Sequence, residues 1–319
     1  MVRNTANEPV QWRGTSGVRT FAPTEANHMD RKDFLRKSLL GAGAATMSGA
    51  VLASRDDETA SADRPTGFNH LPTENPRIIA NTVLHKAATR GHADHGWLNS
   101  HHTFSFANYY DPQRMHFGVL RVLNDDSVAP GMGFGTHPHD NMEIISIPLE
   151  GDLEHKDSMG NTAVIRNGDV QVMSAGTGIR HSEYNRNKDA HVKFLQIWVF
   201  PDKRGVQPRY DQITLDASKR HNRLQQILSP KADDDGVWIH QNAWFHLGTF
   251  DKGFRTSYAL KDNRNGVYVF VIKGDVTVNG IALNQRDGLG VEQATTLDLQ
   301  ADSDGAEVLL MEVPMEVRT

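Results

Sequence analysis

The sequence contains no cysteine among its 319 residues, and basic residues do not predominate. The absence of cysteine excludes disulfide bonds, thiolate metal sites and cysteine nucleophiles, so that His, Asp, Glu, Ser, Lys and Tyr remain for chemistry. The chain has 34 Lys and Arg residues against 39 Asp and Glu residues, which gives a net charge of −5. Because a protein that follows a phosphate backbone needs excess positive charge, we expect no nucleic-acid partner.

Long apolar runs are also scarce, and the main one lies near the start of the chain. Residues 39–53 form an apolar stretch that is too short and too rich in Gly and Ala for a good membrane span. A basic segment precedes it and an Ala-Ser-Ala sequence ending at Ala62 follows, which is the pattern of an export signal. The basic segment contains Arg31-Lys32-Asp-Phe-Leu, which resembles the twin-arginine signal with Lys in place of the second Arg.

The export pattern defines the beginning of the chain. Residues 1–62 are predicted to form an N-terminal extension with a twin-arginine-like export signal, in which Met29 is the true start. We therefore expect a periplasmic protein without a membrane span after signal removal, or a cytoplasmic protein if the signal is not functional. Residues 63–78 contain three prolines and no periodicity, so they are predicted to be a linker.

The body of the chain has no convincing segment of helical period. It consists of short runs rich in Val, Ile and Phe, which include residues 117–123, 143–149, 192–200, 268–274 and 308–313. Gly, Asn-Gly, Asp and Pro turn signals separate these runs at close spacing. Alternating short strands and turns of this kind predict an all-β sandwich or barrel.

A weak internal repeat indicates that the β unit occurs twice. The sequence Ile147-Pro-Leu-Glu-Gly with a later Asn-Gly-Asp turn parallels Val271-Ile-Lys-Gly with a later Asp-Gly turn. We predict a first barrel over residues 79–200, a connection over 201–236 and a second barrel over 237–319. The second copy has no His-x-His sequence before its Gly turn, so metal chemistry is expected only in the first barrel.

Histidines and carboxylates follow glycine-rich segments in the first barrel. His137-Pro-His139 is the one His-x-His spacing in a chain with 16 histidines, and by itself it is weak evidence. Because side chains of a strand alternate between its faces, His137, His139 and Glu143 have the same parity and can converge. His181 and Glu183 repeat the i, i+2 spacing in a second segment. Two such pairs on neighbouring strands predict a site for one divalent transition metal.

Other histidines and aromatic residues are given structural interpretations. His101 and His102 are interpreted as structural residues at a strand or turn, and the alternative is that they line the pocket. Trp198 and Phe200 are predicted to belong to the barrel core. No Ser-His-Asp order, phosphate-binding Gly loop or dinucleotide fingerprint stands out in the sequence.

Three segments of the chain resemble the pirin family. They are the stretch from His92 to Asp111, the sequence Gly-Phe-Gly-Thr-His-Pro-His that ends at His139, and the sequence from Ser174 to Asn185. The match covers most of the chain and is closest to the bacterial quercetinase-like branch. It implies a bicupin fold, a double-stranded β-helix with two jelly-roll barrels, of which the second is degenerate.

The resemblance implies metal ligands at four positions, which are His137, His139, His181 and Glu183. The sequence departs from the general cupin pattern, which has Pro where Ser174 stands and a shorter gap between the Gly and the His of the second motif. General cupins take their carboxylate ligand from the position of Glu143, whereas pirins take it from that of Glu183. We therefore favour Glu183, and Glu143 becomes a candidate group that orients a ligand.

Imidazole and carboxylate ligands without sulfur suit Fe, Mn, Cu, Ni or Zn, of which we expect iron. The resemblance implies a flavonol 2,4-dioxygenase, similar to quercetin 2,3-dioxygenase, that opens the flavonol heterocycle with O₂. In that reaction Glu183 is both a ligand and the base that takes the hydroxyl proton.

The expected partners are a flavonol-like aromatic substrate and O₂, and a monomer is expected. The alternative is a metal-binding regulatory or protein-interaction module without turnover, as the eukaryotic branch implies.

Overall fold

The computed structural model describes residues 81–318, so the predicted export signal and linker within residues 1–78 lie outside the described part. Two short 3-10 helices, η1 (Ala87–Thr89) and η2 (Ala217–Lys219), are the helical elements between residues 81 and 318. All other regular structure in this range is β-strand, which confirms the predicted all-β class. Over the same residues, no helix is long and apolar enough to cross a membrane.

The first barrel combines a seven-stranded and a four-stranded sheet. The larger sheet contains β2 (Gly91–Asp94), β3 (Leu98–His102), β4 (Leu120–Val128), β6 (Glu143–Glu150), β9 (Asp169–Ser174), β11 (Val192–Val199) and β12 (Arg209–Thr214). The smaller sheet contains β5 (Gly133–His139), β7 (Leu153–Asp157), β8 (Thr162–Ile165) and β10 (Ile179–Asn185). The strand orders are β12-β9-β6-β11-β4-β3-β2 and β5-β10-β7-β8.

The second barrel repeats this arrangement. Its larger sheet contains β1 (Asn81–His85), β13 (Gln225–Ser229), β14 (Val237–Trp238), β15 (Trp244–Phe250), β17 (Asn265–Lys273), β20 (Gly288–Glu292) and β22 (Ala306–Pro314). Its smaller sheet contains β16 (Arg255–Ala259), β18 (Val276–Val278), β19 (Ile281–Leu283) and β21 (Thr296–Ala301). The orders β1-β20-β17-β22-β15-β13-β14 and β16-β21-β18-β19 match those of the first barrel strand for strand, which confirms the predicted bicupin fold.

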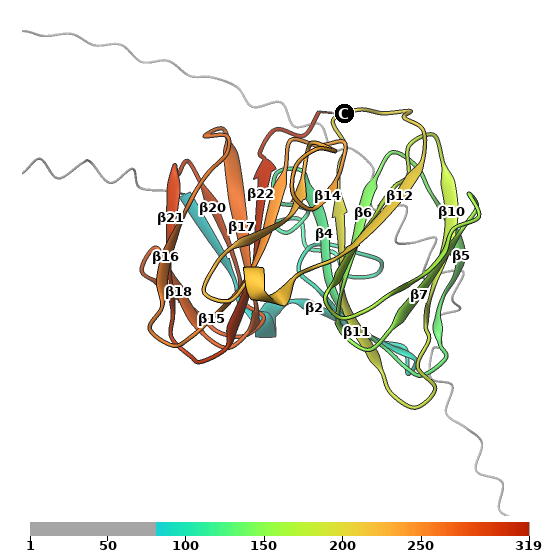
Figure 1. The fold of residues 1–319 in the computed structure, drawn as a ribbon, viewed down its shortest axis with the longest axis horizontal. Helices are drawn as coiled ribbons and strands as arrows, with labels where there is room; N and C mark the ends of the chain where they lie inside the picture. The colour runs from blue at the N-terminus through green and yellow to red at the C-terminus, as the bar shows by residue number, and fades with distance from the viewer. Residues whose placement is uncertain (1–80, 319) are drawn as a thin grey trace, which may run out of the picture.

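The two seven-stranded sheets lie back to back in the middle of the molecule, and the four-stranded sheets form its outer walls (Figure 1). Because side chains alternate along a strand, each large sheet has one face toward its own barrel and one toward the other barrel. Leu123, Ile145 and Leu195 of the first barrel therefore share one buried apolar cluster with Phe245 and Leu309 of the second. Strands β5 and β10, which carry the predicted ligands, belong to the outer wall of the first barrel.

The chain exchanges edge strands between the barrels. Strand β1 precedes the first barrel in the sequence but pairs with β20 of the second, from Asn81 opposite Glu292 to His85 opposite Gly288. Within the predicted connection over 201–236, β12 pairs with β9 of the first barrel and β13 pairs with β15 of the second. Strand membership thus differs from the predicted boundaries, because the spacing of apolar residues does not report which sheet edge a strand joins.

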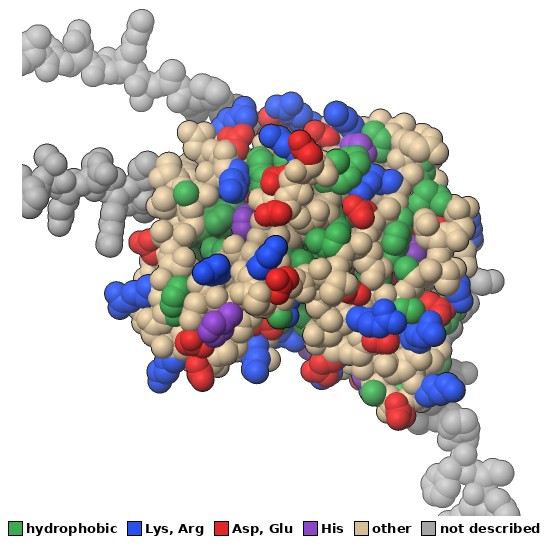
Figure 2. Space-filling model, in the orientation of Figure 1, with side chains coloured by type: hydrophobic (Ala, Val, Ile, Leu, Met, Phe, Trp, Pro, Cys, Tyr) green, Lys and Arg blue, Asp and Glu red, His purple; other side chains and the backbone are tan. Residues whose placement is uncertain are grey.

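Basic and acidic side chains are interspersed over the face of the molecule shown in Figure 2. A surface that binds nucleic acid instead gathers Lys and Arg into a continuous stripe that follows the phosphates. On the face shown, the Lys and Arg side chains alternate with acidic and uncharged ones.

Candidate metal centre

Strands β5 and β10 pair antiparallel and bring the two predicted histidine segments together. His181 lies directly opposite His137, and the register then shifts before Glu183. The shift sets two residues of β5 against one of β10, a bulge that directs both His137 and His139 to the barrel interior. Gly133 allows this close approach of the strands, because a Cβ at this position would collide with the carbonyl oxygen of Glu183.

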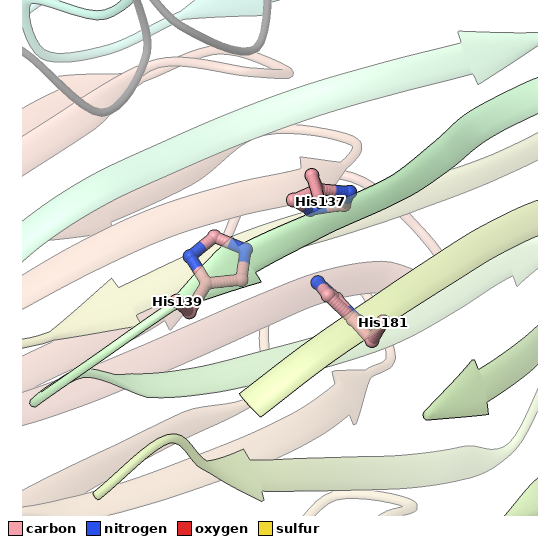
Figure 3. A group of neighbouring side chains, drawn as sticks. All are labelled: His137, His139 and His181. Atoms are coloured by element: carbon pink, nitrogen blue, oxygen red, sulfur yellow. The ribbon is translucent and has the colours of Figure 1, made fainter. Parts of the chain in front are cut away.

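The three histidines predicted as ligands form one compact cluster (Figure 3). Their candidate ligand nitrogens all lie within 4.8 Å of one another. The ring centroids of His137 and His181 are 4.4 Å apart, and those of His139 and His181 are 4.9 Å apart. His137 and His139 project from one strand and His181 from its neighbour, so that the rings surround a common space. None of the three side chains is more than 7% exposed.

Burial keeps these imidazoles neutral. Desolvation lowers the pKa of His137 to about 4 and holds the pKa values of His139 and His181 well below their usual range. A neutral imidazole has the lone pair that binds a metal, whereas an imidazolium has none. At neutral pH the three histidines can therefore bind a divalent cation without first releasing protons.

Two side chains behind His181 determine which of its nitrogens faces the cluster. The Nε2 atom of His155 lies 3.2 Å from Asp157 Oδ2, and its Nδ1 atom lies 3.5 Å from His181 Nδ1. Because a carboxylate only accepts hydrogen bonds, His155 carries its proton on Nε2, and its Nδ1 then accepts from His181 Nδ1–H. This leaves a lone pair on His181 Nε2, which is buried and has no hydrogen-bond partner within residues 81–318. The donor set therefore fits a metal ion.

Sequence reasoning missed His155 as part of this centre. The residue is fully buried on β7, and the ring of Tyr210 packs against it with centroids 4.8 Å apart. Burial lowers the pKa of His155, so the ring is neutral, as the hydrogen-bonding pattern requires. The signal that would have identified it is the spacing of His155 and Asp157, which repeats the i, i+2 pattern of His181 and Glu183 on a neighbouring strand.

Glu183 lies beside the three-histidine cluster and belongs to a second, overlapping group of candidate ligands with His155 and His181. Its Oε1 atom accepts a hydrogen bond of 3.0 Å from Ser146 Oγ. Burial raises the pKa of Glu183 to about 7, although the bond from Ser146 opposes the shift. A carboxyl group with this pKa can release or take up a proton near neutral pH. The place of Glu183 as fourth ligand stays a prediction.

Glu143 does not orient a ligand, so that part of the sequence interpretation is wrong. The chain leaves β5 at His139 and enters the other sheet at Glu143, so the shared parity of the two residues has no meaning across the turn. Glu143 accepts a hydrogen bond of 2.6 Å from Ser174 Oγ, and Arg209 lies close enough to affect its ionisation. Burial raises the pKa of Glu143 to about 7. Its contacts lie on the side of the sheet that faces the second barrel.

Aromatic side chains enclose the space beside His139. The ring of Trp198 lies 5.0 Å from that of His139 and 5.4 Å from that of Phe106. His102 lies 5.3 Å from Phe106 and is 1% exposed. Trp198 belongs to the apolar cluster of the barrel, as predicted, and also borders the centre. For His102 the structure favours the pocket alternative, whereas His101 stacks on His92.

Two family models match the chain, namely Pirin over residues 83–199 and Quercetinase C-terminal cupin domain over residues 226–313. A protein of Escherichia coli (strain K12) named quercetin 2,3-dioxygenase is 47% identical over 231 residues, which are 72% of this chain and 98% of that protein. A pirin-like protein of Caulobacter vibrioides is 42% identical over 221 residues, which are 69% of this chain and 94% of that protein.

A solved structure is similar over the same part of the chain. The bacterial pirin YhhW of Escherichia coli, in complex with nickel(II), has a TM-score of 0.70 and 44% identity, and the alignment covers 74% of this chain and all of that one. The fold and these matches define a cupin of the pirin type, and its buried histidine cluster is a candidate metal centre. The chain belongs to the pirin family.

Proposed function

We propose that this pirin is a metal-dependent dioxygenase that opens the heterocycle of quercetin or a similar flavonol with O₂. The observation that carries the proposal is the buried cluster of three neutral imidazoles beside a carboxyl group of raised pKa. The names of the relatives, quercetin 2,3-dioxygenase among them, support the substrate class. We propose one divalent metal ion, with iron as the first candidate and Mn, Cu, Ni and Zn as alternatives.

His137, His139 and His181 hold the metal in this proposal, together with Glu183. The bound ion supplies Lewis-acid and redox chemistry to the enol oxygen of the substrate and to O₂. His155 and Asp157 keep the proton of His181 on Nδ1 and so keep its Nε2 directed at the ion.

Glu183 is the proposed base for the 3-hydroxyl proton of the flavonol. In the metal-free protein burial raises the pKa of Glu183 to about 7, so this carboxyl group can hold or release a proton near neutral pH. Ser146 holds Oε1 in place through its hydroxyl donor. The ring of Trp198 packs between those of His139 and Phe106, so that the histidines have apolar neighbours, and polar interactions are stronger in such surroundings than in water.

The test is the turnover of quercetin by protein loaded separately with Fe, Mn, Cu, Ni or Zn, followed by absorbance in the presence and absence of O₂. The proposal requires an O₂-dependent loss of the flavonol band with at least one metal, and a loss of that activity in His137→Ala. If no metal form consumes a flavonol and a stoichiometric protein partner is captured instead, the regulatory-module alternative replaces it.

We further propose that residues 1–62 direct a monomeric protein to the periplasm. The proposal rests on the basic, apolar and small-residue pattern of that segment. Cell fractionation of the full chain, compared with a variant in which Arg31 and Lys32 are both changed to Gln, tests it. The variant should stay in the cytoplasm, and equal periplasmic amounts of both proteins would contradict the assignment.

A further inference from the structure

A row of polar side chains crosses the large sheet of the first barrel. The row follows directly opposed residues on five neighbouring strands, which are Gln171, Ser146, Gln196, Asn124 and His102. Directly opposed residues of antiparallel strands point to the same face of the sheet. All five side chains therefore lie side by side on one face, and none is more than 6% exposed.

This face is the one that looks toward the candidate metal centre. Ser146, in the middle of the row, donates its hydroxyl hydrogen bond to Glu183 on the opposite wall. Trp198 follows Gln196 by two residues and so lies on the same face, and its ring contacts that of His139. At the end of the row, His102 contacts Phe106, which in turn contacts Trp198. The row and the histidine cluster thus line one interior space from two sides.

Three members of the row have no hydrogen-bond partner among the residues that the structure describes. Both side-chain polar atoms of Asn124 and of Gln171 are buried and unpaired, and so are both ring nitrogens of His102. Buried amides and imidazoles are nearly always hydrogen-bonded in folded proteins, because unpaired groups are costly to desolvate. Asn124 and His102 are adjacent in the row and Gln171 lies at its other end. Three such exceptions on one face point to a partner outside the chain.

We propose that Gln171, Asn124 and His102 form the recognition surface for the hydroxyl and carbonyl groups of the substrate. This inference rests on the proposed function and specifies it, since it predicts a preference for flavonols with several hydroxyl groups. Each amide offers a donor and an acceptor, and so does a neutral imidazole, which suits phenolic hydroxyls that both donate and accept. The rings of Phe106 and Trp198 beside the row provide the apolar contact that an aromatic ligand needs.

The test compares two substrates and four forms of the metal-loaded protein. Quercetin has hydroxyl groups on both ring systems, whereas 3-hydroxyflavone has only the reacting hydroxyl. The forms are the wild type, Asn124→Leu, Gln171→Met and the control Gln226→Leu. Gln226 lies in the second barrel, where its amide donates to the backbone oxygen of Asp235 at the surface. Metal content, kcat/KM for both flavonols and thermal unfolding are measured for each form.

The wild type should prefer quercetin in kcat/KM, and Asn124→Leu and Gln171→Met should each reduce that preference at least about tenfold, because each removes polar partners of the substrate. The same variants should keep their metal and should unfold at a temperature about 2–4 °C higher, since an unpaired amide is replaced by an apolar group of similar size. Gln226→Leu should leave the preference unchanged.

Lower unfolding temperatures with an unchanged substrate preference would overturn the inference, because the row would then be part of the scaffold. Failure of the proposed function gives a different result, namely no turnover of either flavonol by the wild type with any metal. In that case only the unfolding temperatures of the variants test whether the row is a recognition surface. Stabilised variants support a recognition surface for another polar ligand, and destabilised variants reject it.

Discussion

The two barrels have the same strand order, but the first has a polar interior around its histidines and the second has an apolar one. On the outer wall of the first barrel His137 lies opposite His181, whereas on the matching strands of the second barrel Tyr258 lies opposite Leu297. Tyr258, Leu297 and Leu299 all belong to the apolar cluster of the second barrel. The fold therefore does not require a polar interior, and the first barrel has one at the expense of packing.

The inner faces of the two seven-stranded sheets also differ in polarity. Where the first barrel has its polar row, the matching strands of the second barrel present Leu289, Val269, Leu310, His246 and Gln226, three of which are apolar. The second barrel also buries the carboxylates of Asp287 and Glu312. Four groups donate hydrogen bonds to Glu312, namely Tyr258 Oη, the backbone amides of Lys261 and Asp262, and Asn265 Nδ2. In the matching row of the second barrel one ring nitrogen of His246 is unpaired, whereas the row of the first barrel has two amides and an imidazole with no partner within residues 81–318. The difference between the barrels is therefore the number of unpaired polar groups on one face.

The largest expected effect comes from making the first barrel resemble the second. His137→Ala or His181→Ala should lower metal affinity at least about 100-fold, because each change removes a proposed ligand, which has a larger effect than losing a residue that supports one. Circular dichroism should stay that of a folded β protein. His191→Ala, at an exposed position of the same barrel, is the control and should bind metal normally. Unchanged metal content in both ligand variants would place the metal elsewhere.

A truncation in the apolar core of the second barrel should lower stability but not metal binding. Leu297→Ala should reduce the free energy of unfolding by about 2–5 kcal/mol, since Leu297 is 1% exposed and truncation leaves a cavity. Chemical denaturation measures the loss. Metal stoichiometry at low denaturant should not change, because the residue lies in the barrel without the histidine cluster. A drop in metal stoichiometry as well would mean that the barrels are coupled more closely than their separate interiors indicate.

Glu183 should give the centre its pH dependence. Because burial raises its pKa to about 7, protons compete with the metal below that pH, and affinity should fall about tenfold for each further pH unit. The histidines add no step there, since the pKa of His137 lies near 4. Calorimetric metal titrations from pH 6 to 8 should show this slope in the wild type and a flat profile in Glu183→Gln.

The same variant separates the two proposed roles of Glu183. Turnover should fall about 100-fold or more, the usual effect of losing a general base, whereas metal retention at pH 8 should decrease less. Equal losses of turnover and metal would make Glu183 only a ligand. An unchanged pH slope would remove it from the ligand set.

The smallest effect on metal affinity is expected from His155 and Asp157, which lie behind His181. His155→Phe keeps a ring against Tyr210 but removes the acceptor for His181 Nδ1–H, so metal affinity should fall about tenfold. Metal titration at pH 7 measures this change. Asp157→Asn should produce a weaker loss in the same direction, because it weakens the acceptor for His155 Nε2–H but leaves the ring of His155 in place. Asp157 also accepts hydrogen bonds from Met159 and Asn161, so thermal unfolding of this variant is measured as well. Identical affinity in all three proteins would show that neither residue positions His181.

The local spacing of ligands was predictable, but pairing across the sheet was not. His137, His139 and His181 were predicted from two short motifs, and they meet because β5 and β10 are neighbours. The parity argument failed at Glu143, since a turn after His139 carries the chain into the other sheet. The spacing of residues in a motif does not predict that the chain passes into another sheet.

The polar row shows the same limit more clearly. His102 and Asn124 lie on consecutive strands and Gln171 on a strand more distant in the sequence, and no motif connects the three residues. Only the register places them beside one another. The exchange of β1 was likewise beyond reach, because its apolar residues fit either barrel.

That exchanged strand has a consequence for how the protein is made. Asn81 pairs with Glu292, so β1 has no partner until nearly the whole chain has left the ribosome. Contacts between such distant segments form slowly, and an unpaired strand edge is prone to aggregation while it waits. A chain cut after β11 would also expose the apolar face that normally packs on the second barrel. We therefore expect the first strand of the described fold to be synthesised to be among the last fixed in place, and the two barrels to unfold in a single transition.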